Sequence, residues 1–216
     1  MRQVDAKSAL RESLRRQRNE LAPQRQRQAA HDLAEQLKRQ AFFRESRAIA
    51  LYLANDGEID PRQAMDWCLA RGQKCYAPVI AEVDASSAPS ALRFAEITAH
   101  SMDTAAMRPN RFGIAEPAVA PDALIDARDL DLVLLPLVGF DRRGNRIGMG
   151  GGFYDTTFAF KRATPARRPR LVGLAHELQR LERIDADNWD IPISAVVTDQ
   201  RVYHCEPAAD AGDDAN

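Results

Sequence analysis

The stretch DLVLLPLVGF, from Asp131 to Phe140, decides how this chain of 216 residues folds. Its apolar run from Leu132 to Val138 is nearly continuous, which is typical of a central strand covered on both faces of a parallel sheet. The run is far too short to span a bilayer. The stretch therefore predicts the middle of a buried sheet.

Short β-type runs and helical segments alternate around this strand. A helix is expected from DPRQAM, at 60–65, to Gly72, and the β-type runs lie at 48–54, 74–80, 91–97, 170–176 and 194–199. Such alternation predicts an α/β fold with a mainly parallel sheet flanked by helices. Two more helices are expected ahead of the sheet, at about 5–20 and at about 23–40, where Pro23 suits a first helical turn.

The whole chain is expected to form one domain over residues 1–206, with the two first helices as a helical N-terminal segment. No internal repeat is visible and no Gly/Ser linker divides it. The last ten residues, 207–216, are acidic and lack large apolar side chains, which predicts a disordered tail. The stretch DASSAPS, at 84–90, is the expected exposed loop.

Composition argues against several classes of protein. A net charge of -1 gives no general electrostatic case for binding nucleic acid. The start of the chain is polar rather than signal-like, so a cytoplasmic protein without membrane contacts is expected. Cys68, Cys75 and Cys205 are odd in number and lack CxxC spacing, and we expect them to be small buried hydrophobes. We further expect a monomer.

The central strand runs directly into a glycine-rich stretch, RIGMGGGFYD, from Arg146 to Asp155. Together with Gly144 it places five of the 11 glycines within nine residues. Ordering five glycines instead of alanines costs about 3 to 5 kcal/mol, against a typical domain stability of about 5 to 15 kcal/mol. In open α/β sheets, ligands bind beyond the carboxyl ends of strands. The position and the cost together indicate a binding loop.

The residues around these glycines indicate a phosphate ligand. Glycines let several amide N–H groups converge on an anion, and Arg146 can fork onto phosphate oxygens. Asp155 can hold Mg²⁺, which takes one or two carboxylates together with phosphates and water. The stretch matches neither a Walker A sequence nor GxGxxG. It predicts a magnesium-nucleotide site of another kind, while a flexible turn, and for Asp155 a helix N-cap before TTFAFKR, remain alternatives.

A cationic stripe lies on the first predicted helix. Lys7, Arg11, Arg15 and Arg18 follow one another at spacings of four, four and three residues, so they share one face. Spacing alone leaves open whether this face is solvated or belongs to a site.

The stretch PLVGFDRRGNRIGMGGGFYD, at 136–155, resembles the signature of the 5-formyltetrahydrofolate cyclo-ligases, also called methenyltetrahydrofolate synthetases. Supporting motifs cover most of the chain: KSALR at 7–11, LYLANDGEID at 51–60, NRFGIAEP at 110–117 and WDIPISAVVTD at 189–199. The resemblance implies a fold similar to the ribose-phosphate isomerase and CoA-transferase group. It also implies a ligase of one-carbon metabolism that cyclises 5-formyltetrahydrofolate to 5,10-methenyltetrahydrofolate, with ATP as co-substrate, Mg²⁺ as cofactor, and ADP and phosphate released.

The resemblance also implies roles for individual residues. It assigns Mg²⁺ to Asp155, with Asp190 as a second acid, and it assigns the folate to Glu58, Phe112 and Tyr154. For Glu58 an ordinary loop carboxylate, and for Phe112 core packing, remain alternatives. Arg15 and Arg18 are left to solvent. Lys7 and Arg146 are expected to act on the transferred phosphoryl group, and the ATP-binding residues are Lys7, Arg11, Arg146, Gly148, Met149, Gly150, Gly151, Gly152, Phe153 and Tyr154.

The sequence departs from the family pattern at Met149, Phe153, Thr156 and Ser194. Phe153 stands where tyrosine is usual, and Ser194 where an acid is frequent. Phosphate-binding residues say little about the acceptor of the phosphoryl group. A related ligase acting on another pterin or on a thiamine-related compound, and a non-catalytic nucleotide sensor, therefore remain alternatives.

Overall fold

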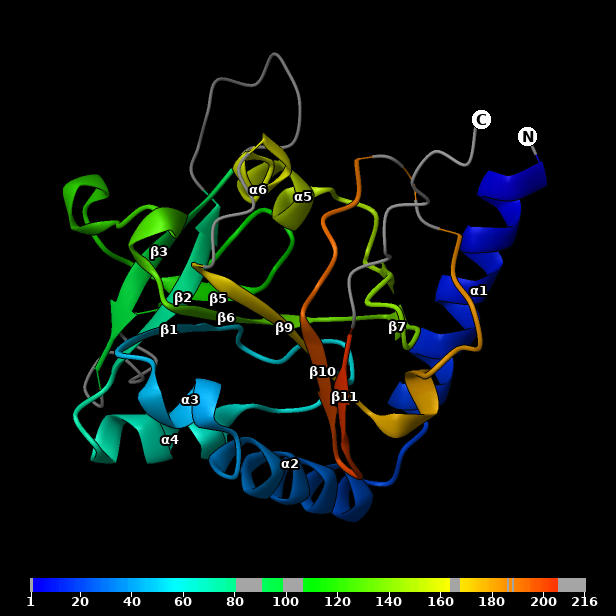
Figure 1. Ribbon diagram of the computed structural model, residues 1–216, viewed down its shortest axis with the longest axis horizontal. Helices are drawn as coiled ribbons and strands as arrows, with labels where there is room; N and C mark the ends of the chain where they lie inside the picture. Colours follow the sequence, from blue (N-terminus) through cyan, green and yellow to red (C-terminus); the bar gives the residue numbers. More distant parts are fainter. Residues whose placement is uncertain are drawn as a thin grey trace, which may run out of the picture.

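A seven-stranded sheet forms the centre of the protein, with strand order β11-β10-β9-β6-β1-β2-β3 (Figure 1). The computed structural model describes residues 2–80, 91–98, 107–163, 168–185, 187 and 189–205. The strands of the sheet are β1 (Ala48–Leu51), β2 (Lys74–Ile80), β3 (Leu92–Ile97), β6 (Leu132–Pro136), β9 (Arg170–Ala175), β10 (Ala195–Thr198) and β11 (Val202–His204). The five inner strands are parallel, and β3 and β11 pair antiparallel at the two edges. The predicted α/β fold is confirmed.

Strand β6 lies in the middle of this sheet because both of its faces are buried. Val133 is paired with Ala50 of β1 on one side and with Leu171 of β9 on the other. Leu132 and Leu134 belong to one apolar core, whereas Val133 belongs to the core on the opposite face. Two buried faces explain why the apolar run in the sequence is continuous rather than alternating.

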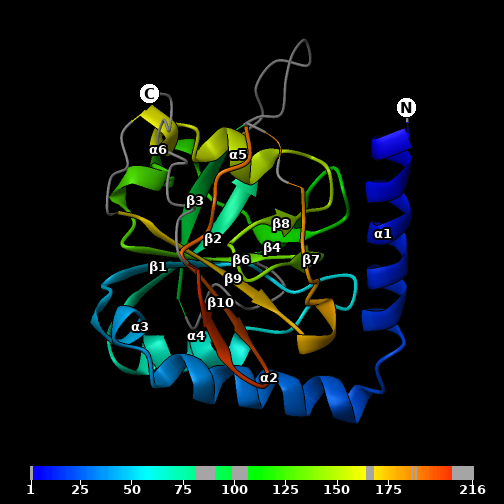
Figure 2. The ribbon, with the colours of Figure 1, turned by 45° about the vertical axis from the view of Figure 1, so that its right-hand side comes forward.

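Helices cover both faces of the sheet. In Figure 1, α2 (Pro23–Lys38), α3 (Ala41–Glu45) and α4 (Arg62–Ala70) lie below it, and α5 (Phe153–Thr157) and α6 (Phe160–Ala163) lie above it. Figure 2 shows α1 (Arg2–Asn19) standing apart at one side of the sheet. Within the described residues, single turns of 3-10 helix lie at η3 (Pro121–Ala123), η4 (Ala127–Asp129) and η5 (Glu177–Gln179).

Two small hairpins lie outside the main sheet, β4 (Met107–Pro109) with β5 (Ala115–Pro117), and β7 (Gly139–Phe140) with β8 (Arg146–Ile147). In the β7–β8 turn, the buried Asp141 carboxylate accepts hydrogen bonds from the amides of Arg143 and Asn145. Gly144 has a φ of 85°, and a Cβ there would lie 2.5 Å from the carbonyl oxygen of Ile193. Gly144 is therefore required by the fold of the turn rather than by a ligand.

A small apolar cluster holds α1 in place. Leu14 is buried with Val138, Ile147 and Ile184, and Leu10 packs against them. Because Ile147 directly precedes the glycine-rich loop, this cluster brings the cationic stripe of α1 beside that loop.

The structure decides several of the predictions made from the sequence. The first two helices are confirmed to within a few residues at each end, and Cys68, Cys75 and Cys205 are buried free thiols, as predicted. The predicted tail at 207–216 and the predicted loop at 84–90 lie outside the described residues. Within the described part of the chain, no helix has the length and apolar character needed to cross a membrane.

The helix expected after Asp155 begins three residues earlier than predicted. Gly152 is the N-cap of α5, with a φ of 66°, and Asp155 is its third residue. The N-cap alternative for Asp155 is wrong, because Gly152 occupies the N-cap position in a left-handed conformation that glycine adopts at little cost.

Candidate active site

One cavity of about 980 Å³ lies beside the carboxyl end of β6, where Pro136 and Leu137 contribute to its wall. Residues from α1, the β1–α4 connection, the β4–β5 hairpin, the β8–α5 loop and the segment before β10 meet there. Every residue to which a site role was assigned lines this cavity: Lys7, Arg11, Glu58, Phe112, Arg146, Gly148, Met149, Gly150, Gly151, Gly152, Phe153, Tyr154, Asp155 and Asp190. The structure thus brings the whole predicted set together.

The glycine-rich loop presents unused backbone donors to the cavity. None of the five amide N–H groups from Gly148 to Gly152 donates a hydrogen bond to any part of the chain that the structure describes. Gly150 has a φ of 94°, and a Cβ at Gly148 or Gly150 would have no other described atom within 4 Å. Open space beside free N–H groups is what an anion needs to approach a backbone closely.

Arg146 and Asp155 close the base of this loop. The guanidinium Nη2 lies 2.5 Å from Asp155 Oδ1, and Nη1 donates to the carbonyl oxygen of Ile191. The amide of Ile191 in turn donates to the same Asp155 oxygen at 3.1 Å. These bonds connect the loop to the segment before β10, and they leave Asp155 Oδ2 without a hydrogen bond from the described residues.

Two cations of α1 reach the cavity from the opposite side. Lys7 Nζ lies 2.8 Å from Asp187 Oδ2, and Arg11 Nε donates to the carbonyl oxygen of Gly148 at 2.9 Å. Both positive groups therefore face the glycine-rich loop and the acidic segment beside it. Asp187 had no assigned role in the sequence, since its partner Lys7 is 180 residues away.

The acids of the cavity fit Mg²⁺ delivered with a nucleotide better than a resident metal. Among the described residues, no group of three or more His, Cys, Asp and Glu could hold an ion. Asp155 and Asp190 do line the same cavity as the free amides of the loop. Two carboxylates are sufficient where phosphate oxygens and water complete the coordination of Mg²⁺. Asp190 Oδ2 also accepts the amide of Asp187 at 2.9 Å, which orders this segment.

Glu58 enters the cavity from the β1–α4 connection. Its Oε2 accepts the amide of Asn55 at 3.1 Å, and only 12% of its side chain is exposed. Burial raises the pKa of Glu58 to about 7, against the opposing effects of the Asn55 amide and the Arg18 charge. A carboxyl group with this pKa changes its charge near neutral pH.

The assignment to solvent is wrong for Arg18, whose side chain is fully buried and lies 3.8 Å from Glu58 Oε1. The Arg15 side chain remains 43% exposed and is bonded to Asp56 Oδ2 at 2.6 Å. Both arginines bond the Asp56 carboxylate in the chain after β1, and no local pattern around α1 could reveal this partner.

Aromatic rings form another part of the wall. Phe112 is 56% exposed, so the core-packing alternative is wrong for it. Its ring meets Phe153 edge to face, with centroids 5.7 Å apart, and the Arg111 guanidinium lies over it. Phe153, where the family pattern has tyrosine, thus supports Phe112 through an apolar contact. Tyr154 stacks on Phe158, and burial, followed by the Glu58 charge, raises the pKa of its hydroxyl.

Some cavity residues were missed by sequence reasoning. Trp189 is 62% exposed and lines the cavity, and Arg162 donates to its carbonyl oxygen. The position of Trp189 next to Asp190 was the feature of the sequence that could have identified it as a cavity residue. Ser194, by contrast, lies directly before β10, where its hydroxyl donates to the carbonyl oxygen of Leu171 and accepts from Arg170. The residue at this departure from the family pattern therefore connects the start of β10 to β9.

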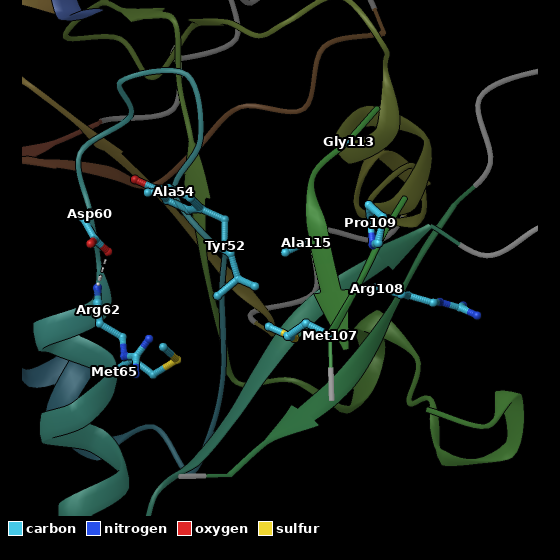
Figure 3. Close-up of a pocket in the computed structure, with 11 residues that line it drawn as sticks. Tyr52, Ala54, Asp60, Arg62, Met65, Met107, Arg108, Pro109, Gly113 and Ala115 are labelled. Carbon is cyan, nitrogen blue, oxygen red and sulfur yellow. Dashed lines mark hydrogen bonds between the residues drawn. The ribbon is translucent and has the colours of Figure 1, made fainter. Parts of the chain in front are cut away.

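A second cavity of about 500 Å³ adjoins the first, with Tyr52, Leu53 and Ala115 in the walls of both. Figure 3 shows it between the start of α4, with Asp60, Arg62 and Met65, and the β4–β5 hairpin, with Met107 and Ala115. The Tyr52 hydroxyl donates to the carbonyl oxygen of Ile59 at 2.5 Å. None of the residues with an assigned site role lines this second cavity.

The fold and the larger cavity define an α/β protein whose cavity, at the carboxyl ends of its parallel strands, presents free backbone amides and cations. Comparison with known proteins is more specific. The chain belongs to the 5-formyltetrahydrofolate cyclo-ligase family, whose model matches residues 3–199.

Individual members of this family match the chain over most of their length. The 5-formyltetrahydrofolate cyclo-ligase of Escherichia coli (strain K12) is 31% identical over 190 residues, which cover 88% of this chain and 98% of that protein. Its counterpart from Haemophilus influenzae is 32% identical over 187 residues, covering 85% and 92%. The solved structure of 5,10-methenyltetrahydrofolate synthetase from Aquifex aeolicus matches with a TM-score of 0.73 and 26% identity, covering 97% of this chain and 98% of that one.

Membership of this family makes the chain an enzyme of the ligase class in folate and one-carbon metabolism. The family reaction forms 5,10-methenyltetrahydrofolate from 5-formyltetrahydrofolate, and ATP as co-substrate is implied by that reaction. The family thus decides against a non-catalytic sensor and against a ligase for thiamine-related compounds.

Proposed function

We propose that this chain uses ATP and Mg²⁺ to cyclise 5-formyltetrahydrofolate to 5,10-methenyltetrahydrofolate. The observation that carries the proposal is the single cavity in which the free amides of the glycine-rich loop, the cations of α1 and the pair of Glu58 and Phe112 line one space. A phosphoryl donor and a folate can meet there without a movement of domains.

The chemistry explains why the enzyme needs ATP. A formamide oxygen is a poor leaving group, so N10 of the folate cannot close the ring by expelling it. Transfer of the γ-phosphoryl group to that oxygen breaks the bond to ADP and creates an activated iminium phosphate. N10 then attacks the formyl carbon and loses its proton, and the C–O bond breaks as phosphate leaves. The first step depends on alignment and charge stabilisation rather than on a protein nucleophile.

The loop and the cations supply this charge stabilisation in our proposal. The amides from Gly148 to Gly152 hold phosphate oxygens, and Arg146, Lys7 and Arg11 add positive charge around them. In the absence of a nucleotide, Lys7 is paired with Asp187 and Arg146 with Asp155. We infer that the phosphates of ATP take the place of these carboxylates as partners of the two cations.

Asp155 and Asp190 are the residues that would hold Mg²⁺ bound with the nucleotide. The ion would neutralise phosphate charge when it is bound. Exchange of partners supports this assignment, because an arginine that turns from Asp155 to a phosphate leaves the carboxylate free for a cation.

Glu58 and Phe112 are proposed to bind the folate. A pterin ring presents neighbouring N–H donors, which the ionised Glu58 carboxylate accepts, and a flat face, on which the exposed Phe112 ring stacks. Tyr154, in the first turn of α5 directly after the loop, lines the same cavity and is proposed to contact both ligands. A monomeric, cytoplasmic enzyme of one domain over residues 1–206 remains our expectation.

Formation of the methenyl product by the purified protein tests this proposal through its absorbance. We expect product only when 5-formyltetrahydrofolate, ATP and Mg²⁺ are all present, with one ADP formed per product. 10-Formyltetrahydrofolate and a thiamine-related compound serve as acceptor controls. Product without ATP would contradict the mechanism, and turnover of the thiamine-related compound alone would contradict the substrate.

A further inference from the structure

Arg18 is a fully buried cation beside the proposed folate site. Its guanidinium donates from Nε to the carbonyl oxygen of Asp56 at 2.7 Å and from Nη2 to Asp56 Oδ2 at 3.0 Å. Its Nη1 donates to the carbonyl oxygen of Leu137, just beyond β6, at 3.0 Å. A buried arginine is tolerated only where such partners compensate its desolvation, so the site is built around this side chain.

The turn that Arg18 holds has an unusual backbone. Asp56 has a φ of 51° and Gly57 a φ of 72°, so two successive residues are left-handed. This conformation is unfavourable for a residue with a Cβ and persists where surrounding bonds enforce it. Asn19, at the end of α1, donates to Asp56 Oδ1 at 3.0 Å, and the ring of the buried His176 lies 3.3 Å from the Gly57 carbonyl oxygen.

The left-handed turn leads directly to Glu58. Two hydrogen bonds close the turn. The Asn55 amide donates to Glu58 Oε2, and the Glu58 amide donates to the Asn55 carbonyl oxygen. Arg18 Nη2 lies 3.8 Å from Glu58 Oε1, an ion-pair distance that is too long for a hydrogen bond. One guanidinium therefore connects the end of β6, the backbone of the turn and the charge of Glu58.

We propose that Arg18 is a positioning residue that fixes the turn from Asn55 to Glu58 against the end of β6 and so holds the Glu58 carboxylate in place for the folate. This inference rests on the proposed role of Glu58 in folate binding. Arg18 does not itself line the cavity. It acts through the turn and through its charge.

The charges around Glu58 give this proposal a second readout. Arg18 faces it from α1, Asp56 from its own turn, Tyr52 from the end of β1 and Tyr154 from α5. Arg18 is the cation that favours the ionised carboxylate, opposing the rise in the pKa of Glu58 that burial and Asp56 cause. Removal of the Arg18 charge should therefore move the titration of Glu58 to higher pH.

The test compares Arg18→Lys and Arg18→Met with the matched variant Arg16→Met, which alters an exposed arginine of the same helix. Lysine keeps the charge but cannot form the forked contacts of arginine. For Arg18→Lys we expect the KM for 5-formyltetrahydrofolate to rise about tenfold, as for a displaced partner of a charged group, with the KM for ATP within about twofold of the parent. For Arg18→Met we also expect the pH limb of kcat/KM for the folate to move to higher pH. Arg16→Met should behave like the parent.

If Arg18 had only a structural role, its variants would have a lower melting temperature and a smaller active fraction, but the folate KM and the pH limb of kcat/KM would not change. That result would overturn the proposal. Equal increases in both KM values would overturn it as well. If the Arg18 variants do not fold, Asp56→Asn answers the same question, since asparagine tolerates the left-handed backbone but gives Arg18 a neutral partner. An unchanged folate KM in Asp56→Asn would then contradict the proposal.

Glu58→Gln, measured in parallel, separates this inference from the proposed function. An unaltered folate KM in Glu58→Gln would contradict the role of Glu58 itself. A raised folate KM in Glu58→Gln together with parental values in Arg18→Lys would contradict only the positioning role of Arg18.

Discussion

Arg146 and Asp155 are bound to each other across the base of the glycine-rich loop, with Nη2 2.5 Å from Oδ1. The arginine side chain is 7% exposed, so this is one of the better shielded ion pairs of the cavity. Shielding strengthens the pair and holds the two ends of the loop together. A ligand that binds in the loop meets both charges at once, and substitutions at the two positions should consequently have different signatures.

Arg146→Ala is expected to lower turnover by about two to three orders of magnitude, as loss of a positioned charge stabiliser does. The fold should persist, because the side chain bonds to only one backbone oxygen and one carboxylate. Steady-state kinetics and a thermal melt measure the two effects. Arg143→Ala, which alters an exposed arginine of the preceding turn, is the control. Parental turnover in Arg146→Ala would remove the residue from the site, and an unfolded variant would make it structural.

Asp155→Asn should raise the Mg²⁺ concentration needed for half-maximal activity, since a neutral amide replaces an anionic ligand of the same shape. A magnesium titration at saturating ATP measures this shift. Asp185→Asn changes an exposed acid that pairs with Arg183 and should leave the titration where it is. If Asp155 serves only to hold Arg146, its variant will lose activity at every Mg²⁺ concentration alike.

Lys7→Ala and Arg11→Ala should raise the KM for ATP more than the KM for the folate, because both cations face the glycine-rich loop from α1. Asp187→Asn provides a matched test, since it removes the present partner of Lys7 but leaves the lysine available to phosphate. We expect no increase in the KM for ATP in Asp187→Asn. An increase equal to that of Lys7→Ala would show that the lysine serves only the ion pair.

Glu58→Gln should remove a pH dependence of folate binding. The carboxylate must be ionised to accept pterin N–H groups, so the folate KM of the parent should fall as the pH rises through about 7. In Glu58→Gln the folate KM should be higher and flat over the same range. A parallel pH dependence in both proteins would assign the titration to another group.

The same raised pKa predicts a pH dependence of stability. The pKa of Glu58 rises on folding from 4.5 to about 7, so its stabilising contribution is complete below pH 4.5 and is lost as the pH rises through about 7. The melting temperature of Glu58→Gln relative to the parent should therefore increase from pH 4.5 to a pH above 7. Comparison of the two proteins cancels the effect of His176, whose pKa burial lowers. A difference in melting temperature that does not change with pH would contradict the raised pKa of Glu58.

Much of the fold could be predicted because the strands of the parallel sheet have apolar side chains throughout. The run from Leu132 to Leu135 is buried on two faces, so every residue in it is apolar rather than every second one. Strands β4, β5, β7, β8 and β11 were missed because elements of two or three residues cannot display a period. The five-residue helix α3 was missed for the same reason.

The proposed nucleotide site could be predicted because its chemistry is concentrated in one short segment, from Arg146 to Asp155. Contacts between residues that are distant in sequence could not be predicted. Arg18 is bonded to Leu137, 119 residues away, and Lys7 to Asp187, 180 residues away. A pairing over such a separation leaves no local pattern, so an arginine that becomes fully buried looks in the sequence like one more residue of a solvated stripe.

The way in which α1 is attached matters for anyone who purifies this protein. Among the side chains that the structure describes, those of α1 contribute to neither of the two large apolar cores. The helix is held by Leu10 and Leu14 in a separate small cluster and, near its end, by the bonds of Arg18 and Asn19 to Asp56. Proteolytic clipping ahead of Arg11 would remove Lys7 and Leu10 while the sheet, its cores and Leu14 stayed in place. From the proposed role of Lys7, we expect a clipped sample to unfold cooperatively but to bind ATP weakly, so intact mass must be measured before low activity is attributed to a substitution.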